Sequence, residues 1–244
     1  VESLFEKVDI VDVTTPHRYH VDYAVMALER NVHVMTEKPM GRTWWEVRRI
    51  KEAAEESKAR YQLSDNNAYI PRFQMLKKAI DAGYIGEINC FEFYHGSGWL
   101  GHDDSSPFFW DPIEAGGGAM MDYASHAVTL SMFLTSFEAK VLSVKSMGIR
   151  RVFKNRPLRG LMQEIHVDDD VHIKILFEDP RSKNWITARF QAGWVPSIIG
   201  KGESEENSYV RVIGGEGEIT GDHTTKDEEG YFWEVKKFGH GNKK

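Results

Sequence analysis

The sequence has few of the features that mark secreted or membrane proteins. It contains a single cysteine, Cys90, among its 244 residues. One cysteine excludes an internal disulfide framework and is typical of a reducing compartment. No apolar run approaches the roughly 20 residues that span a bilayer, and residues 1–6 lack the basic start and apolar core of a signal peptide. We therefore expect a cytoplasmic protein that does not contact a membrane.

Positive charge is also scarce. Thirty-one Lys and Arg against 37 Asp and Glu leave a net charge of −6, so we do not expect a surface for nucleic acid. Hydrophobic residues make up 41% of the chain, which is enough to build a core and argues against disorder. The length suits one large domain or two modest ones. A small molecule is the expected ligand.

The first part of the chain alternates short β-branched runs with amphipathic segments. Their spacing predicts three strands and two helices, at 8–13, 32–35 and 60–64 and at 17–30 and 44–58. The second helix begins with a capping box, Thr43-Trp44-Trp45-Glu46, in which hydroxyl and carboxylate each satisfy a free amide. Strands that alternate with helices over short links pair in parallel. Residues 1–66 therefore predict part of a doubly wound Rossmann sheet, the second half only.

The pattern changes after residue 66. We expect helices at 73–82 and 119–134, and strands at 88–95, 140–148, 167–177, 184–192 and 208–213. Residues 178–183 are a clear hairpin turn, Glu-Asp-Pro-Arg-Ser-Lys, and turns at this spacing favour antiparallel pairing. Residues 67–244 are thus expected to form an α+β domain, a largely antiparallel open sheet with helices on one face. The whole chain is α/β plus α+β.

Two polar segments come directly after predicted parallel strands. Thr14-Thr15-Pro16 ends the first strand and Glu37-Lys38-Pro39 ends the second. Ligands of open α/β sheets bind at the carboxyl ends of strands, so the Lys38 ammonium is expected to point into a crevice there. The alternatives are a solvated surface lysine and, for the threonines, a turn that caps a helix.

The apolar helix at 119–134 contains two polar residues, Asp122 and His126, and follows the triplet Gly116-Gly117-Gly118. At i and i+4 the two side chains share one helix face. Burying an Asp carboxylate in an apolar helix costs free energy unless a partner or a water-filled cavity contacts it. A His held by a carboxylate has a fixed tautomer and can transfer protons. The alternative is a polar pair satisfied within the core.

Two further patterns carry less weight. The segment Gly96–Gly101 matches the dinucleotide fingerprint G-x-G-x-x-G, but a loop sequence follows it where the fingerprint needs a helix. We therefore interpret it as a chance match. A second pattern is the alternation of polar residues at His166, Asp168, Asp170 and His172. These side chains could bind a metal, but the alternation is also typical of the solvent-exposed face of a sheet. We expect no metal.

Taken together, three motifs resemble the Gfo/Idh/MocA family, that of glucose–fructose oxidoreductase and inositol dehydrogenase. They are Thr15-Pro16-His17-Arg18-Tyr19-His20, Glu37-Lys38-Pro39 and the segment from Gly116 to His126. The segment 80–88 also resembles the family's link into its second domain. The resemblance covers about residues 4 to 220.

The resemblance implies a two-domain oxidoreductase that transfers a hydride between NAD or NADP and a hydroxyl of a sugar, cyclitol or related polyol. It implies catalytic roles for Lys38 as electrostatic partner, Asp122 as substrate ligand and orienter, and His126 as acid/base. Trp110 would join these three around the substrate. The cofactor would be lined by Thr14, Thr15, Pro16, His20, Glu37 and Lys38. The second-domain sheet would join copies into a dimer or tetramer.

The sequence also departs from the family. Members begin with a strand, a G-x-G-x-x-G turn and a helix, which these 244 residues lack. We therefore expect roughly 50–70 further residues before Val1, in line with the usual Rossmann layout. Two alternatives stay open. One is a non-catalytic regulator on the same scaffold, and the other is a glycosidase that uses a tightly held NAD.

Overall fold

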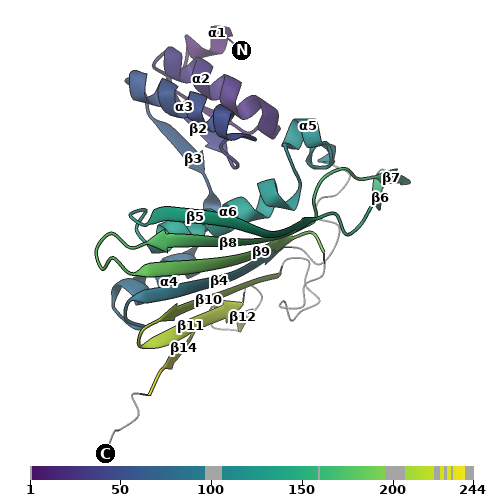
Figure 1. The fold of residues 1–244 in the computed structure, drawn as a ribbon. Coiled ribbons are helices and arrows are strands. Elements are labelled where there is room, and N and C mark those ends of the chain that lie inside the picture. The colour runs from purple at the N-terminus through teal and green to yellow at the C-terminus, as the bar shows by residue number, and fades with distance from the viewer. Residues whose placement is uncertain are drawn as a thin grey trace, which may run out of the picture.

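The structure is a computed structural model that describes residues 2–96, 106–158, 160–195, 207–222, 226–227, 230–231 and 233–239. It contains a small parallel sheet formed by residues 10–64 and a larger mixed sheet formed by strands from the later part of the chain (Figure 1). Within these residues, no helix is both long enough and apolar enough to cross a membrane.

The first sheet has the strand order β1-β2-β3, and both pairings are parallel. Its elements are α1 (Glu2–Phe5), β1 (Ile10–Val13), η1 (His17–Tyr19), α2 (His20–Glu29), β2 (His33–Glu37), α3 (Trp44–Glu56) and β3 (Tyr61–Ser64). Val13, Leu28 and Ile50 meet in its core. The predicted part of a Rossmann sheet is confirmed, because α2 connects β1 to β2 and α3 connects β2 to β3, and both pairs are parallel.

The start of α3 has the predicted capping box, to which Arg42 adds further contacts. The Thr43 hydroxyl accepts a hydrogen bond from the Glu46 amide at 3.2 Å, and the Glu46 carboxylate bonds the Thr43 backbone in return. The carboxylate also accepts from the amide of Arg42 at 2.7 Å and pairs with the Arg42 guanidinium. Free amides at the start of the helix are therefore satisfied by both side chains of the box.

The second sheet has seven strands in the order β14-β11-β10-β4-β9-β8-β5. The helical elements of this part are η2 (Asn66–Tyr69), α4 (Pro71–Asp81), η3 (Pro107–Trp110), α5 (Pro112–Ala115) and α6 (Ala119–Leu134). The seven strands are β4 (Ile88–Gly96), β5 (Lys140–Arg150), β8 (Asp170–Glu178), β9 (Trp185–Gly193), β10 (Asn207–Gly214), β11 (Gly217–Asp222) and β14 (Glu234–Lys237). Two separate antiparallel pairs are formed by β6 (Asn155–Leu158) with β7 (Leu161–Glu164) and by β12 (Lys226–Asp227) with β13 (Gly230–Tyr231).

All neighbours in this sheet are antiparallel except β4 and β9, which pair in parallel at its centre. Helices α4 and α6 lie along one face (Figure 1). The rings of Phe91, Phe93 and Phe190 stack in the core beneath them. On the opposite face, Glu92 pairs with Arg189 and Arg211. The predicted α+β architecture is confirmed.

Several elements differ from the expectation. The hairpin β6–β7 and the strands β11 and β14 were not predicted, because their sequences lack a clear alternation of apolar and polar residues. Helix α4 begins at Pro71 rather than Phe73, since proline suits the first helical position. Strand β8 begins only at Asp170, because Asp168 caps a helix instead.

That cap explains the third glycine of the triplet before α6. The Asp168 carboxylate accepts hydrogen bonds from the amides of Gly118 and Met120 at 2.9 and 2.7 Å. The carbonyl of Asp168 also accepts from the Ala119 amide at 2.9 Å. A Cβ on Gly118 would overlap that carbonyl oxygen. Glycine therefore allows the negatively charged cap to reach the start of α6, which fixes where the helix begins.

The two parts of the chain are joined by contacts between η1 and α5. The ring of His17 is buried, and its Nδ1 donates to the carbonyl of Ala115 at 2.9 Å. Its edge contacts with Phe108 and Phe109 have centroid separations of 5.3 and 5.6 Å. Arg18 adds an ion pair with Glu114 at 2.7 Å. Burial lowers the pKa of His17 to about 4, so the junction holds a neutral imidazole.

This burial makes a prediction about stability and pH. The unfolded chain binds a proton on His17 below its ordinary pKa of 6.5, whereas the folded chain binds it only below about 4. The contribution of His17 to the free energy of unfolding should therefore be fully present above pH 6.5. It should fall by about 3 kcal/mol as the pH drops toward 4. In urea unfolding across this pH range, we expect the free energy of unfolding of His17→Gln to lack this decrease. The exposed His33→Gln is the control, and equal pH slopes in wild type and His17→Gln would contradict the prediction.

Candidate active site

Lys38 comes directly after β2 and reaches α6. Its ammonium pairs with the Asp122 carboxylate and also donates to the Asp122 carbonyl at 3.1 Å. The Lys38 side chain is 15% exposed and that of Asp122 is 3% exposed. Lys38 is therefore not a solvated surface lysine. A segment from the parallel sheet and a helix from the second part of the chain meet at this ion pair.

Asp122 has a second donor on its other oxygen. The indole Nε1 of Trp194 donates to Asp122 Oδ2 at 3.1 Å, and Trp194 is fully buried. A carboxylate in an apolar helix is stable only when its charge is paired and its oxygens are hydrogen-bonded. Lys38 and Trp194 together meet that need and hold the carboxylate in one position.

His126 lies one turn further along α6 and contacts a carboxylate that sequence reasoning missed. Its Nδ1 is 2.9 Å from Oδ1 of Asp65, just after β3. The same rule that selected Lys38, a polar residue at the carboxyl end of a parallel strand, could have selected Asp65. Burial alone would raise the pKa of Asp65, but the hydrogen bond and charge of His126, with hydrogen bonds from Thr129 and the Asn67 backbone, outweigh it and lower that pKa.

The segments after β1 and β2 are tied together by His20. This buried ring has Nδ1 2.9 Å from the carbonyl of Pro39 and Nε2 2.9 Å from the carbonyl of Thr15. His20 therefore fixes the two loops relative to one another. Its ring nitrogens face backbone rather than an open site.

The other four residues expected near a cofactor have distinct surroundings. The Thr15 hydroxyl is buried and has no hydrogen-bond partner within the described part of the chain. A buried hydroxyl without a partner is costly, so it suits a site where a polar ligand supplies the missing bond. The exposed Glu37 carboxylate accepts from the Lys38 amide at 3.2 Å. Thr14 is exposed at the same edge of the sheet, and Pro16 begins the turn into η1.

Trp110 lies behind this site in a buried stack. Its ring packs edge-on against Trp194 with a centroid separation of 4.9 Å. The Arg156 guanidinium lies over the same ring at 5.2 Å and donates to the Trp194 carbonyl at 2.9 Å. The Trp110 Nε1 is also buried without a partner among the described residues. The stack fixes Trp194 and, through it, Asp122.

The weaker candidates have structural roles. Gly96 is the last residue of β4, and a Cβ there would overlap the Gly193 carbonyl of β9. This glycine allows two strands to approach, while residues 97–101 of the fingerprint match lie outside the described residues. Asp170 pairs with Arg150 and His172. In the ranges that the structure covers, no group of three or more His, Cys, Asp or Glu could hold a metal ion.

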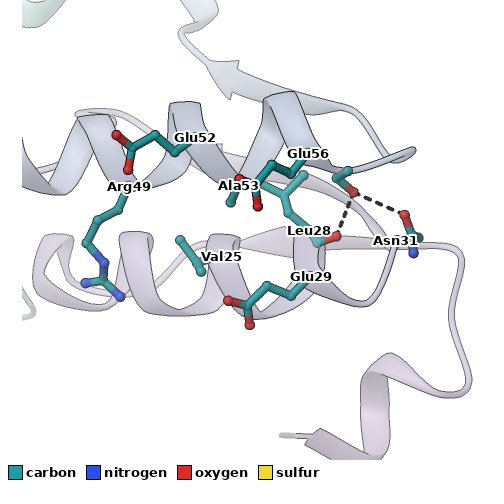
Figure 2. Close-up of a pocket in the computed structure, with 9 residues that line it drawn as sticks. Val25, Leu28, Glu29, Asn31, Arg49, Glu52, Ala53 and Glu56 are labelled. Atoms are coloured by element: carbon teal, nitrogen blue, oxygen red, sulfur yellow. Dashed lines mark hydrogen bonds between the residues drawn. The ribbon is translucent and has the colours of Figure 1, made fainter.

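Neither of two hollows in the described part of the chain contains Lys38 or Asp122. One of about 500 Å³ lies between α2 and α3 and is lined by Arg49, Glu52 and Glu56 among others (Figure 2). It shares no residue with the Lys38 site. The other, of about 10 Å³, borders His126 and holds at most about one water molecule. The polar groups around Lys38, rather than either hollow, define the candidate active site.

The chain matches two sequence models of oxidoreductases. Residues 1–64 match a model described as oxidoreductase family, NAD-binding Rossmann fold. Residues 73–220 match the GFO/IDH/MocA C-terminal domain. The second match alone covers more than half of the chain.

Individual relatives agree with these matches. Levoglucosan dehydrogenase from Pseudarthrobacter phenanthrenivorans is 27% identical over 240 residues, which cover 91% of this chain and 57% of the relative. The scyllo-inositol 2-dehydrogenase (NADP+) IolW from Bacillus subtilis is 31% identical over 85 residues, which cover 35% of this chain and 24% of the relative.

Solved structures show the same fold. Levoglucosan dehydrogenase in complex with NADH and L-sorbose superposes with a TM-score of 0.74 at 22% identity. The match covers 97% of this chain and 63% of that one. The chain therefore spans less than two thirds of the length of these relatives. From the two family matches that together cover most of its residues, the chain belongs to the Gfo/Idh/MocA family of oxidoreductases.

Proposed function

We propose that this protein transfers a hydride reversibly between the nicotinamide of NAD or NADP and a hydroxyl-bearing carbon of a sugar, cyclitol or related polyol. The observation that carries the proposal is the meeting of Lys38 and Asp122, beside His126, at the carboxyl ends of the parallel strands. The names of the relatives support the substrate class, since one is a levoglucosan dehydrogenase and another a scyllo-inositol dehydrogenase.

The cofactor would lie along the segments that follow β1 and β2. Thr14, Thr15, Pro16, Glu37 and Lys38 would line it, and His20 would hold the two segments in register. The buried Thr15 hydroxyl without a partner among the described residues fits such a ligand. When bound, the nicotinamide supplies the hydride acceptor or donor, and the protein supplies orientation and a path for the proton.

The proton of the reacting hydroxyl would move to His126. With Nδ1 held by Asp65, Nε2 is the nitrogen that accepts the proton on oxidation and returns it on reduction. The Lys38 ammonium would stabilise the negative charge that develops on the substrate oxygen. Asp122 would accept a hydrogen bond from the substrate while holding Lys38 in place. Trp110 would form the wall behind them.

Three further features belong to this proposal. Residues 1–66 would bind the cofactor and residues 67–244 the substrate. The open face of the second sheet, with Glu92, Arg189 and Arg211, would join copies into a dimer or tetramer. The single cysteine and the negative net charge support a cytoplasmic protein that acts on small molecules.

Loss of either Lys38 or His126 should abolish most turnover. We expect Lys38→Ala or His126→Asn to lower kcat roughly 100- to 10,000-fold, because a positioned acid or base contributes about that much. Circular dichroism should show that both variants stay folded. The exposed Lys51→Ala and His166→Asn are matched controls that should keep wild-type rates. Wild-type turnover in His126→Asn would contradict its role.

The reaction class can be tested directly on the purified protein. We expect levoglucosan, scyllo-inositol or an alkyl glucoside to reduce NAD+ or NADP+, measured by the absorbance of the reduced nicotinamide. Release of the aryl group from an aryl glycoside without net reduction would instead indicate a glycosidase. Absence of both reactions, with the cofactor bound, would favour a regulator.

A further inference from the structure

We propose that Asp65 is a positioning residue that fixes the tautomer and orientation of the His126 ring. The inference rests on the proposed function, in which His126 transfers the proton. It adds a fourth residue to the site and gives it a role that Asp122 was expected to fill.

The contact is short, buried and anchored. His126 Nδ1 lies 2.9 Å from Asp65 Oδ1. Asp65 is 3% exposed and His126 is 9% exposed, so water does not compete strongly for either group. The same carboxylate oxygen accepts from the Asn67 amide at 3.1 Å. The backbone therefore holds the carboxylate in the orientation that meets the ring.

Its place in the fold makes this contact a link between the two sheets. Asp65 follows β3, the last strand of the parallel sheet, and caps η2 at the start of the second part of the chain. His126 lies in the middle of α6, which packs against η2. The ring is also in edge contact with His95 of β4 at 5.3 Å. The imidazole is thus confined by α6, by β4 and by the segment of Asp65 and η2.

The Asp65 carboxylate determines which ring nitrogen of His126 carries the proton. An ionised carboxylate only accepts hydrogen bonds, so Nδ1 must carry the proton and Nε2 is left with the lone pair. The negative charge also stabilises the imidazolium that forms when Nε2 accepts a proton. The lowered pKa of Asp65 keeps its carboxylate ionised near neutral pH.

Asp122 is less suited to this task, although it lies on the same helix face as His126. Its two oxygens are already engaged by the Lys38 ammonium and the Trp194 indole. Moving that carboxylate toward the ring would weaken a buried ion pair, which is costly. Asp122 therefore pairs with Lys38, whereas Asp65 accepts the hydrogen bond from His126.

The tautomer can be measured without any substrate. In protein labelled with ¹⁵N-histidine, two-bond correlations show which ring nitrogen carries the proton. We expect the wild-type His126 ring to be protonated at Nδ1, and Asp65→Ala to shift it toward the Nε2-protonated form that predominates in free histidine. The control is Asp170→Asn, another buried ion-paired carboxylate, which should leave the signal unchanged. An Nε2-protonated ring in the wild type would overturn the inference.

Kinetics separate this inference from the proposed function. We expect the near-isosteric Asp65→Asn to lower kcat roughly 10- to 100-fold, as loss of the carboxylate behind a metal-bound histidine does. KM and NAD affinity should stay near wild type. In the His126→Asn background, Asp65→Asn should have no further effect, because it acts only through the ring.

Each outcome has a distinct meaning. Wild-type kcat in Asp65→Asn together with an inactive His126→Asn would overturn the positioning role and leave the proposed function standing. Full activity in His126→Asn would overturn the proposed function itself. Independent losses that multiply in the double variant would show that Asp65 does not act through His126.

Discussion

The buried ion pair between Lys38 and Asp122 is the constraint on which the site depends. Each charge would be costly alone, because the Lys38 side chain is only 15% exposed and that of Asp122 only 3%. Together they fix the position of α6 relative to the end of β2. That placement sets His126 beside Asp65 and leaves the carboxyl ends of the parallel strands facing polar groups of the second part.

Other contacts keep this arrangement in place. Asp168 fixes where α6 begins, Trp194 holds the second oxygen of Asp122, and the neutral His17 ties η1 to α5. A site that must change the charge of one ring during turnover benefits from such fixed surroundings, because preorganised groups need not rearrange.

Local signals in the sequence predicted most of the fold. Parallel strands, the apolar helix α6 and the polar residues Lys38, Asp122 and His126 could all be found by periodicity and by position after a strand. Asp65 also follows a parallel strand, but its partner is 61 residues away and its own neighbours look like an ordinary turn, so its role beside His126 could not be predicted from the sequence. The hairpin β6–β7 was missed for a related reason, since tertiary contacts through Arg156 rather than its own pattern secure it.

A double-mutant cycle on Lys38 and Asp122 tests the central claim most directly. Lys38→Met, Asp122→Asn and the double variant would be unfolded in urea. Because a buried charge left without its partner is strongly destabilising, we expect each single change to cost about 3 kcal/mol. The double change should cost little more than one, which gives a coupling free energy of about 2 kcal/mol or more. Additive losses, within about 0.5 kcal/mol, would show that the two charges do not hold the two parts together.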